Sequence, residues 1–133
     1  MSAKKILIAE DDKVTLTLLS KTIEKHGFIA IQCSDGKRAW DTLKDNSDID
    51  LLITDMKMPN LAGDELIKLV NEDEKLSGLP IIIISGVVKL SEIKHILDSG
   101  ASRFLPKPIN TEELIEYINR LLFGPGAAQE LQT

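Results

Sequence analysis

The sequence predicts an α/β fold, a (βα)5 doubly wound sheet of five parallel strands in which a helix follows each strand. Two observations support this class. Short apolar runs alternate five times with segments of helical periodicity, which is typical of parallel sheets whose crossovers are helices. The apolar residues of the first run, 6–9, are consecutive rather than alternating, as in a strand that helices cover on both faces. The length of 133 residues fits one such domain.

The first two units follow this pattern with different strength. Residues 6–9 are expected to form a central strand, and residues 12–26 a helix that Asp12 caps and that ends before Gly27. Residues 28–33 alternate only weakly, so they predict an edge strand, followed by a short helix over 36–44. The side chains expected to face the core from these two helices are Val14, Leu18, Leu19, Ile23, Ala39, Trp40 and Leu43.

The remaining three units are predicted from their apolar centres. Strands are expected over 49–54, 81–84 and 103–105, and the first of these stops at Asp55. The last of them is broken by the Pro-Lys-Pro run at 106–108. The helices between and after them are marked by Leu66, Ile67 and Val70, by Ile93, Ile96 and Leu97, and, from about Thr111, by Leu114, Ile115, Ile118, Leu121 and Leu122.

Residues 1–123 are therefore expected to form one domain, with a flexible tail or linker stub over 124–133. Helix breakers open this last segment, and few apolar residues follow them. Because the predicted fold takes up nearly the whole length, we expect an input module whose output lies on another molecule or on a further domain of a longer chain.

Charge and composition exclude several classes. Acidic residues outnumber basic ones by 21 to 16, and no basic stripe is available for direct nucleic-acid binding. The single cysteine cannot form an internal disulfide, and the N-terminus has no signal-peptide core. The longest apolar run, 81–84, is far shorter than the roughly 18 residues of a membrane span. A cytoplasmic protein without membrane insertion is expected.

Polar and charged side chains stand where the predicted strands end. Glu10 and Asp11 follow the first strand, Asp55 the third and Ser85 the fourth, and Lys107 comes just after the fifth. In open parallel sheets the ligand site lies at this edge, where the topology reverses direction. With the strand order 2-1-3-4-5, which we assume, the first, third and fourth strands are neighbours and these side chains converge.

This group of residues suits phosphoryl transfer. Three carboxylates in one crevice repel one another, and a divalent cation relieves the repulsion. Oxygen ligands without His or Cys suit Mg²⁺, with Mn²⁺ as an alternative, rather than zinc. A metal, a hydroxyl and a lysine neutralise charge on a transferred phosphoryl group while a carboxylate attacks phosphorus. Asp55, which stands alone at its strand end, is the predicted nucleophile.

Four segments together give the chain a family resemblance: ILIAEDD, LLITDMKMPNLAG, IIIISG and RFLPKP, in this order and at these spacings. With them the sequence resembles the response-regulator receiver domains of two-component signalling, the CheY-like family, from about Lys4 to Leu122. The resemblance implies a regulatory domain rather than a turnover enzyme. Asp55 would accept a phosphoryl group from a sensor histidine kinase or phosphotransfer protein, and the signal would pass to a downstream protein by contact.

The resemblance also implies the roles of the other site residues. Glu10 and Asp11 would hold Mg²⁺ together with Asp55, and the backbone carbonyl of Lys57 would complete the metal shell. Glu10 stands where Asp is more usual, which adds one methylene to a ligand that acts through water. Metal binding is expected to survive this change.

Further expectations concern the switch. Ser85 and Lys107 would contact the phosphoryl group, and the Lys107-Pro108 bond would be cis. Ser85 and Phe104 would be the switch residues, although they replace the commoner Thr and Tyr, so a readout through a phenol hydroxyl is lost. The readout surface would be the fourth helix, fifth strand and fifth helix. The chain would be a monomer or a dimer that forms on phosphorylation.

Other classes remain as alternatives. Within the family, the chain could be a receiver from a hybrid kinase or longer regulator, with 124–133 as the start of its linker. A phosphatase with an aspartyl nucleophile would want a second acid two residues later, where Lys57 stands. A flavin or nucleotide binder would want a Gly/Ser/Thr-rich loop instead of the acids at 10–12. A receiver that no longer takes phosphate would be expected to lose Asp55 or Lys107, and both are present.

Several further residues are assigned structural roles. Cys33 is predicted to be a buried, inert thiol, because no histidine lies near it in sequence. His26 and His95 fall on outward helical positions and are expected to be solvated. The apolar residues at 87–88 and Leu90 are interpreted equally well as local core or as part of a partner surface.

Overall fold

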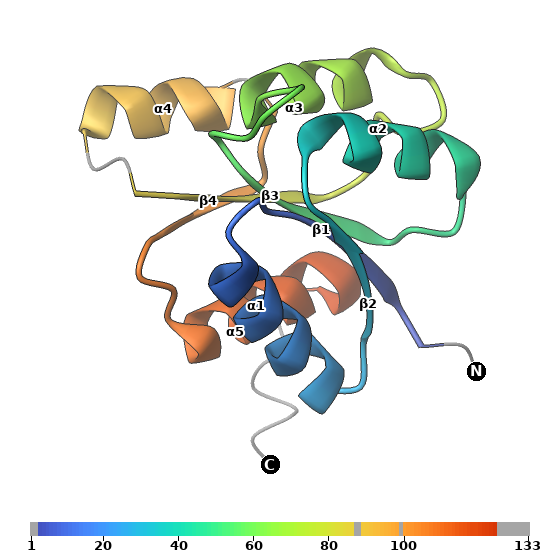
Figure 1. Ribbon diagram of the computed structural model, residues 1–133, viewed down its shortest axis with the longest axis vertical. Helices are drawn as coiled ribbons and strands as arrows, with labels where there is room; N and C mark the ends of the chain where they lie inside the picture. The colour runs from blue at the N-terminus through green and yellow to red at the C-terminus, as the bar shows by residue number, and fades with distance from the viewer. Residues whose placement is uncertain (1–2, 87–88, 99, 125–133) are drawn as a thin grey trace.

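The computed structural model describes residues 3–86, 89–98 and 100–124. Over these ranges strands and helices alternate, and the five strands form one parallel sheet in the order β2-β1-β3-β4-β5 (Figure 1). The strands are β1 (Lys5–Ala9), β2 (Ile29–Cys33), β3 (Leu51–Asp55), β4 (Ile81–Ser85) and β5 (Arg103–Pro106), and the helices are α1 (Lys13–Lys25), α2 (Gly36–Asp45), α3 (Gly63–Glu72), α4 (Leu90–Asp98) and α5 (Thr111–Phe123). The predicted doubly wound class and strand order are confirmed.

Helices cover both faces of the sheet. Helices α2, α3 and α4 lie on one face, and α1 and α5 lie on the other (Figure 1). Each face has its own apolar core, because successive residues of a strand point to opposite sides. Leu7 and Leu52 belong to the core under α2 and α3, whereas Ile6 and Ile53 belong to the core under α1 and α5. This double coverage explains the consecutive apolar residues of the central strands.

The strands differ in burial as their places in the sheet require. Every residue of β3 and β4 is buried, and so is β1 after its first residue. The two edge strands, β2 and β5, each keep exposed positions. The sequence predicted that β3 would end before Asp55. Asp55 is instead the last residue of β3, because its backbone pairs with Ile84 of β4.

The inward face predicted for α1 is partly wrong. Val14 is 78% exposed and Leu18 is 44% exposed, whereas Leu19 and Ile23 are buried. Leu16 also packs against the core on this side of the sheet. The apolar residues of α1 form two stripes that lie roughly 150° apart around the helix, and the helix packs through the stripe of Leu16, Leu19 and Ile23. The other stripe faces away from the sheet.

Two predicted features lie outside the described residues: most of the expected tail, 125–133, and the apolar pair at 87–88. Within the described ranges, none of the helices combines the length and the apolar character needed to cross a membrane.

Candidate functional site

The register of the sheet brings the predicted site residues to one edge. Ala9 pairs with Thr54, so the next residues, Glu10 and Asp55, leave neighbouring strands side by side. On the other flank of β3, Asp55 pairs with Ile84, the residue before Ser85. The carboxyl ends of β1, β3 and β4 therefore meet at the point where the sheet reverses direction, as the assumed strand order requires.

Glu10 is a fully buried carboxylate. Its side chain is 0% exposed, and its Oε2 accepts a hydrogen bond of 3.2 Å from the backbone N–H of Asp12. Its Oε1 lies 2.8 Å from Nζ of Lys107 as an ion pair. No hydrogen bond of good geometry reaches Oε1 from the part of the chain that the structure describes. Burial raises the pKa of Glu10 above its ordinary value, against the opposing effect of Lys107.

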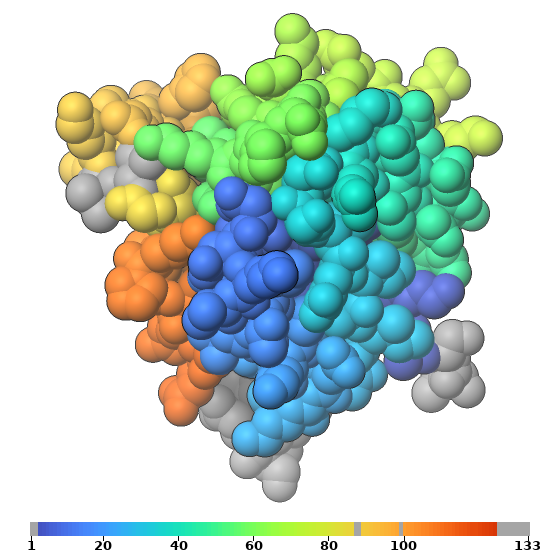
Figure 2. Space-filling model, in the orientation of Figure 1, coloured from blue at the N-terminus to red at the C-terminus, as the bar shows by residue number. Residues whose placement is uncertain are grey.

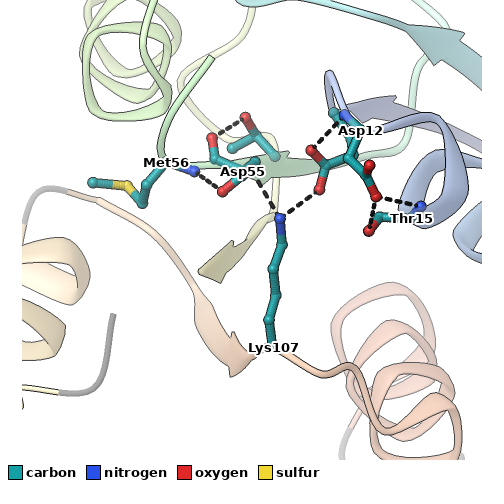
Figure 3. A network of polar contacts seen from close by, with 7 residues as sticks. Asp12, Thr15, Asp55, Met56 and Lys107 are labelled. Carbon is teal, nitrogen blue, oxygen red and sulfur yellow. Dashed lines mark hydrogen bonds and ion pairs between the residues drawn. The ribbon is translucent and has the colours of Figure 1, made fainter. Parts of the chain in front are cut away.

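Lys107 connects the two buried acids. Besides its contact with Glu10, its Nζ donates a hydrogen bond of 2.9 Å to Oδ2 of Asp55. Figure 3 shows the lysine side chain extending from the end of β5 toward Asp55. Burial lowers the pKa of Lys107, but its contacts with Glu10 and Asp55 and their charges outweigh this effect and raise the pKa above its ordinary value. Lys107 is therefore held as a cation between two carboxylates.

Asp55 is held in place on several sides. Its Oδ1 accepts a hydrogen bond of 2.7 Å from the backbone N–H of Met56 (Figure 3). Its backbone carbonyl accepts a bond of 2.9 Å from the hydroxyl of Thr54. Gly63, at the start of α3, lies so close that a Cβ there would be 2.1 Å from the same carbonyl oxygen. The Asp55 carboxylate thus has a fixed position, and the residue is 8% exposed.

Asp11 adds the third carboxylate, and it is exposed. One oxygen from each of Glu10, Asp11 and Asp55 lies within 4.8 Å of the others, so these side chains could hold a metal ion. The set of ligands fits Mg²⁺, because it consists of hard oxygen donors and includes the Oε1 of Glu10, which is buried without a well-formed hydrogen bond. The acidic group predicted from the sequence is thus assembled in space.

The other predicted site residues lie on β4, on β5 and in the loop that follows β3. Ser85 ends β4 and is 2% exposed, and its backbone carbonyl accepts a hydrogen bond of 2.9 Å from the N–H of Lys107. Lys57 is exposed in the loop that follows β3. Phe104, on β5, is half-buried against the core under α2, α3 and α4. The peptide bond between Lys107 and Pro108 is cis, as expected.

The residues assigned structural roles lie as predicted. Asp12 caps α1, where its Oδ2 accepts hydrogen bonds from the backbone N–H and the hydroxyl of Thr15, at 2.9 and 2.6 Å (Figure 3). Cys33 is buried, and burial raises the pKa of its thiol. His26 and His95 are exposed.

The sequence did not predict the residues that position Asp55 and the loop that follows it. Gly63 and the backbone N–H of Met56 fix the position of Asp55. Glycine has no side chain and the N–H belongs to the backbone, so a search for ligand side chains does not find them. Asp35 and Asn60, which hydrogen-bond to each other at 3.2 Å, were also missed. The available signal was the Asp-Gly pair at 35–36 before a helix, which is typical of an N-cap and says nothing about a distant loop.

Comparison with known proteins points to one family. The family model for the response regulator receiver domain matches residues 6–119. A relative described as a chemotaxis protein CheY homolog, from Campylobacter jejuni, is 30% identical over 129 residues, covering 94% of this chain and 99% of the relative.

Two solved structures are similar over nearly the whole fold. The receiver domain of the Francisella response regulator 1452 superposes with a TM-score of 0.83 at 30% identity, covering 90% of this chain and 96% of that one. The signal receiver domain of a signal transduction histidine kinase from Syntrophus aciditrophicus gives a TM-score of 0.84 at 28% identity, covering 92% of each chain. The chain therefore belongs to the response regulator receiver domain family.

Proposed function

We propose that this domain is a phosphorylation-dependent switch in a two-component phosphorelay, with Asp55 as the phosphoacceptor. The single observation that carries the proposal is the position of Lys107, which forms contacts of 2.8 and 2.9 Å with Glu10 and Asp55 at the site edge of the sheet. A structural ion pair would need one acid. Two acids on one lysine, with a third nearby, leave negative charge that a divalent cation would neutralise, and this cation and Lys107 would together offer positive charge to a phosphoryl group.

The phosphoryl group would come from a phosphohistidine of a sensor histidine kinase or phosphotransfer protein. An oxygen of Asp55 attacks phosphorus, and the bond between phosphorus and the ring nitrogen breaks. Its electron pair stays on the imidazole, which takes up one proton from solvent, and an aspartyl phosphate remains on the chain. Lys107 then pairs with a phosphoryl oxygen, and the hydroxyl of Ser85 donates a hydrogen bond to another.

Mg²⁺, when bound, would supply positive charge against the oxygens of the transferred group. Glu10, Asp11, Asp55 and the backbone carbonyl of Lys57 would hold it, with waters in the remaining positions. Mn²⁺ satisfies the same ligand preferences.

The domain would act as a regulator and would assist its own dephosphorylation without sustained turnover. The position two residues after Asp55, where an aspartyl-nucleophile phosphatase wants a second acid, is the exposed Lys57. The output would pass by contact through the surface formed by α4, β5 and α5. This surface includes Leu90, which is 83% exposed, and Leu97, which is 40% exposed. Ser85 and Phe104 would couple it to the site.

Intact-mass analysis after treatment with acetyl phosphate and Mg²⁺ tests the proposal. The wild-type protein is expected to gain the mass of one phosphoryl group, and Asp55→Asn to gain none. Asp64→Asn is the matched control, because Asp64 is an exposed acid in the first turn of α3, and it is expected to behave as wild type. A gain that persists in Asp55→Asn would refute the assignment, and sustained turnover of a generic phosphomonoester would favour a phosphatase.

A further inference from the structure

Asp35 is a buried acid on the same side of the sheet as α3, but it does not belong to the acidic group of the site. It is 8% exposed, and each of its two oxygens has a different partner. Its Oδ1 accepts a hydrogen bond of 2.8 Å from the backbone N–H of Arg38, which caps α2. Its Oδ2 accepts a bond of 3.2 Å from Nδ2 of Asn60. The exposed guanidinium of Arg38 lies 3.7 Å from this second oxygen.

Asn60 lies in the middle of the loop over 56–62, which connects β3 to α3. Its backbone has a φ of 69°, a left-handed conformation that Asn tolerates better than most residues. Next to this contact, Gly36 packs on the same loop, because a Cβ there would come within 1.9 Å of the carbonyl oxygen of Leu61. The start of α2 therefore holds the loop at two adjacent points, and Figure 2 shows the two segments in contact on the surface.

The same loop carries groups that contact the site directly. The N–H of Met56 fixes Oδ1 of Asp55, and the carbonyl of Met56 accepts a hydrogen bond of 2.9 Å from the N–H of Gly63. The second of these bonds joins the two ends of the loop. Asp35 holds the middle of the loop by accepting the hydrogen bond from Asn60.

We propose that Asp35 is a positioning residue for the site, acting through Asn60 to hold the loop over 56–62 in the conformation that metal binding needs. The inference rests on the proposed function in one respect: the carbonyl of Lys57, in this loop, is taken as a metal ligand. Residues that orient a metal ligand commonly change metal affinity by tenfold to a hundredfold when they are replaced. Asp35 thus joins helix capping and loop positioning in one carboxylate.

Two variants of Asp35 separate these roles. Asp35→Ser keeps a good N-cap for α2, but one short hydroxyl cannot serve both Arg38 and Asn60. Asp35→Asn keeps a capping oxygen for Arg38, and its NH2 group can donate a hydrogen bond to Oδ1 of Asn60 once the Asn60 amide has rotated, so the contact between the two residues persists. Both variants remove the same negative charge, so any difference between them reflects the contact with Asn60.

A third variant removes the other partner. Asn60→Gly deletes the side chain without straining a backbone of positive φ. If Asp35 acts through Asn60, the double variant Asp35→Ser with Asn60→Gly is expected to be no worse than the more impaired single variant.

The experiment measures Mg²⁺ affinity by calorimetry of the unphosphorylated protein and amide hydrogen exchange across 56–62. We expect Asp35→Ser to weaken Mg²⁺ binding by about tenfold or more and to speed exchange in the loop, while Asp35→Asn stays within about twofold of wild type in affinity. Unchanged loop exchange and unchanged affinity in Asp35→Ser would overturn the inference. So would an equal loss in both Asp35 variants, because charge would then be the cause. If wild type binds no Mg²⁺, the metal part of the proposed function fails, and loop exchange alone decides the role of Asp35.

Discussion

Replacement of Gly63 by alanine tests how tightly the chain holds Asp55. A Cβ at Gly63 would lie 2.1 Å from the carbonyl oxygen of Asp55 and 2.9 Å from Cα of Met56. Ordinary contact begins at 3.4 Å, so α3 or the end of β3 must move. The obstacle is backbone that pairs with β4, rather than the end of a flexible side chain.

The expected cost follows from these contacts. Overpacking a rigid site costs about 1–3 kcal/mol, and a clash with backbone belongs at the upper end of this range. Alanine is favoured over glycine in a helix by up to about 1 kcal/mol, which offsets part of the cost at this first residue of α3. Gly63→Ala is therefore expected to lower the free energy of unfolding by about 2 kcal/mol. Because the shift displaces Asp55, Mg²⁺ binding is expected to weaken as well.

Gly78→Ala is the matched control. A Cβ at Gly78 would meet nothing within 4 Å, and the backbone there is not left-handed. This variant is expected to be neutral or slightly more stable, by up to about 1 kcal/mol. Urea unfolding followed by the single tryptophan, Trp40, and by circular dichroism measures both effects. A Gly63→Ala protein within about 0.5 kcal/mol of wild type would refute the claim that Asp55 is rigidly packed.

Three further predictions concern the metal, the thiol and the corrected face of α1. Mg²⁺ is expected to stabilise wild type and to raise its urea midpoint. At a Mg²⁺ concentration one hundred times the dissociation constant, the free energy of unfolding should rise by about 2.7 kcal/mol. Asp11→Asn should lose most of this gain, and an equal gain in both proteins would exclude Asp11 as a ligand. Because burial raises the pKa of Cys33, alkylation by iodoacetamide near pH 8 should be slow in the native protein and fast in urea; equal rates would contradict a buried, protonated thiol. Leu19→Ala should cost about 2–5 kcal/mol in unfolding free energy, whereas Val14→Ala should change it by no more than about 0.5 kcal/mol; comparable losses would restore the face predicted from the sequence.

The element order and the edge that carries the site were predictable from the sequence for a physical reason. Strands buried on both faces appear as consecutive apolar residues, and the carboxyl ends of parallel strands necessarily lie at one edge. Glu10 and Asp55 stand directly after or at the end of such runs. Their meeting therefore follows once the strand order is assumed.

Other features depend on three-dimensional packing that no local pattern encodes. Helix α1 has two apolar stripes, and which of them packs is decided by the sheet and α5 rather than by periodicity. The contact between Asp35 and Asn60 joins residues 25 positions apart, and the close packing of Gly63 on Asp55 depends on where α3 begins. These features come from the way the loop over 56–62 packs, and its sequence mixes apolar and turn-forming residues without a period that would predict this packing.

The most direct test of the role of Asp55 is chemical mapping of the phosphorylated residue. Borohydride reduces an acyl phosphate to an alcohol, so an aspartyl phosphate becomes homoserine and stays marked through digestion. After treatment with acetyl phosphate and Mg²⁺, tandem mass spectrometry of the reduced protein is expected to find homoserine at position 55 and nowhere else. Homoserine at another acid, such as position 11 or 64, or no homoserine despite a gain in intact mass, would contradict the assignment of Asp55 as the phosphoacceptor.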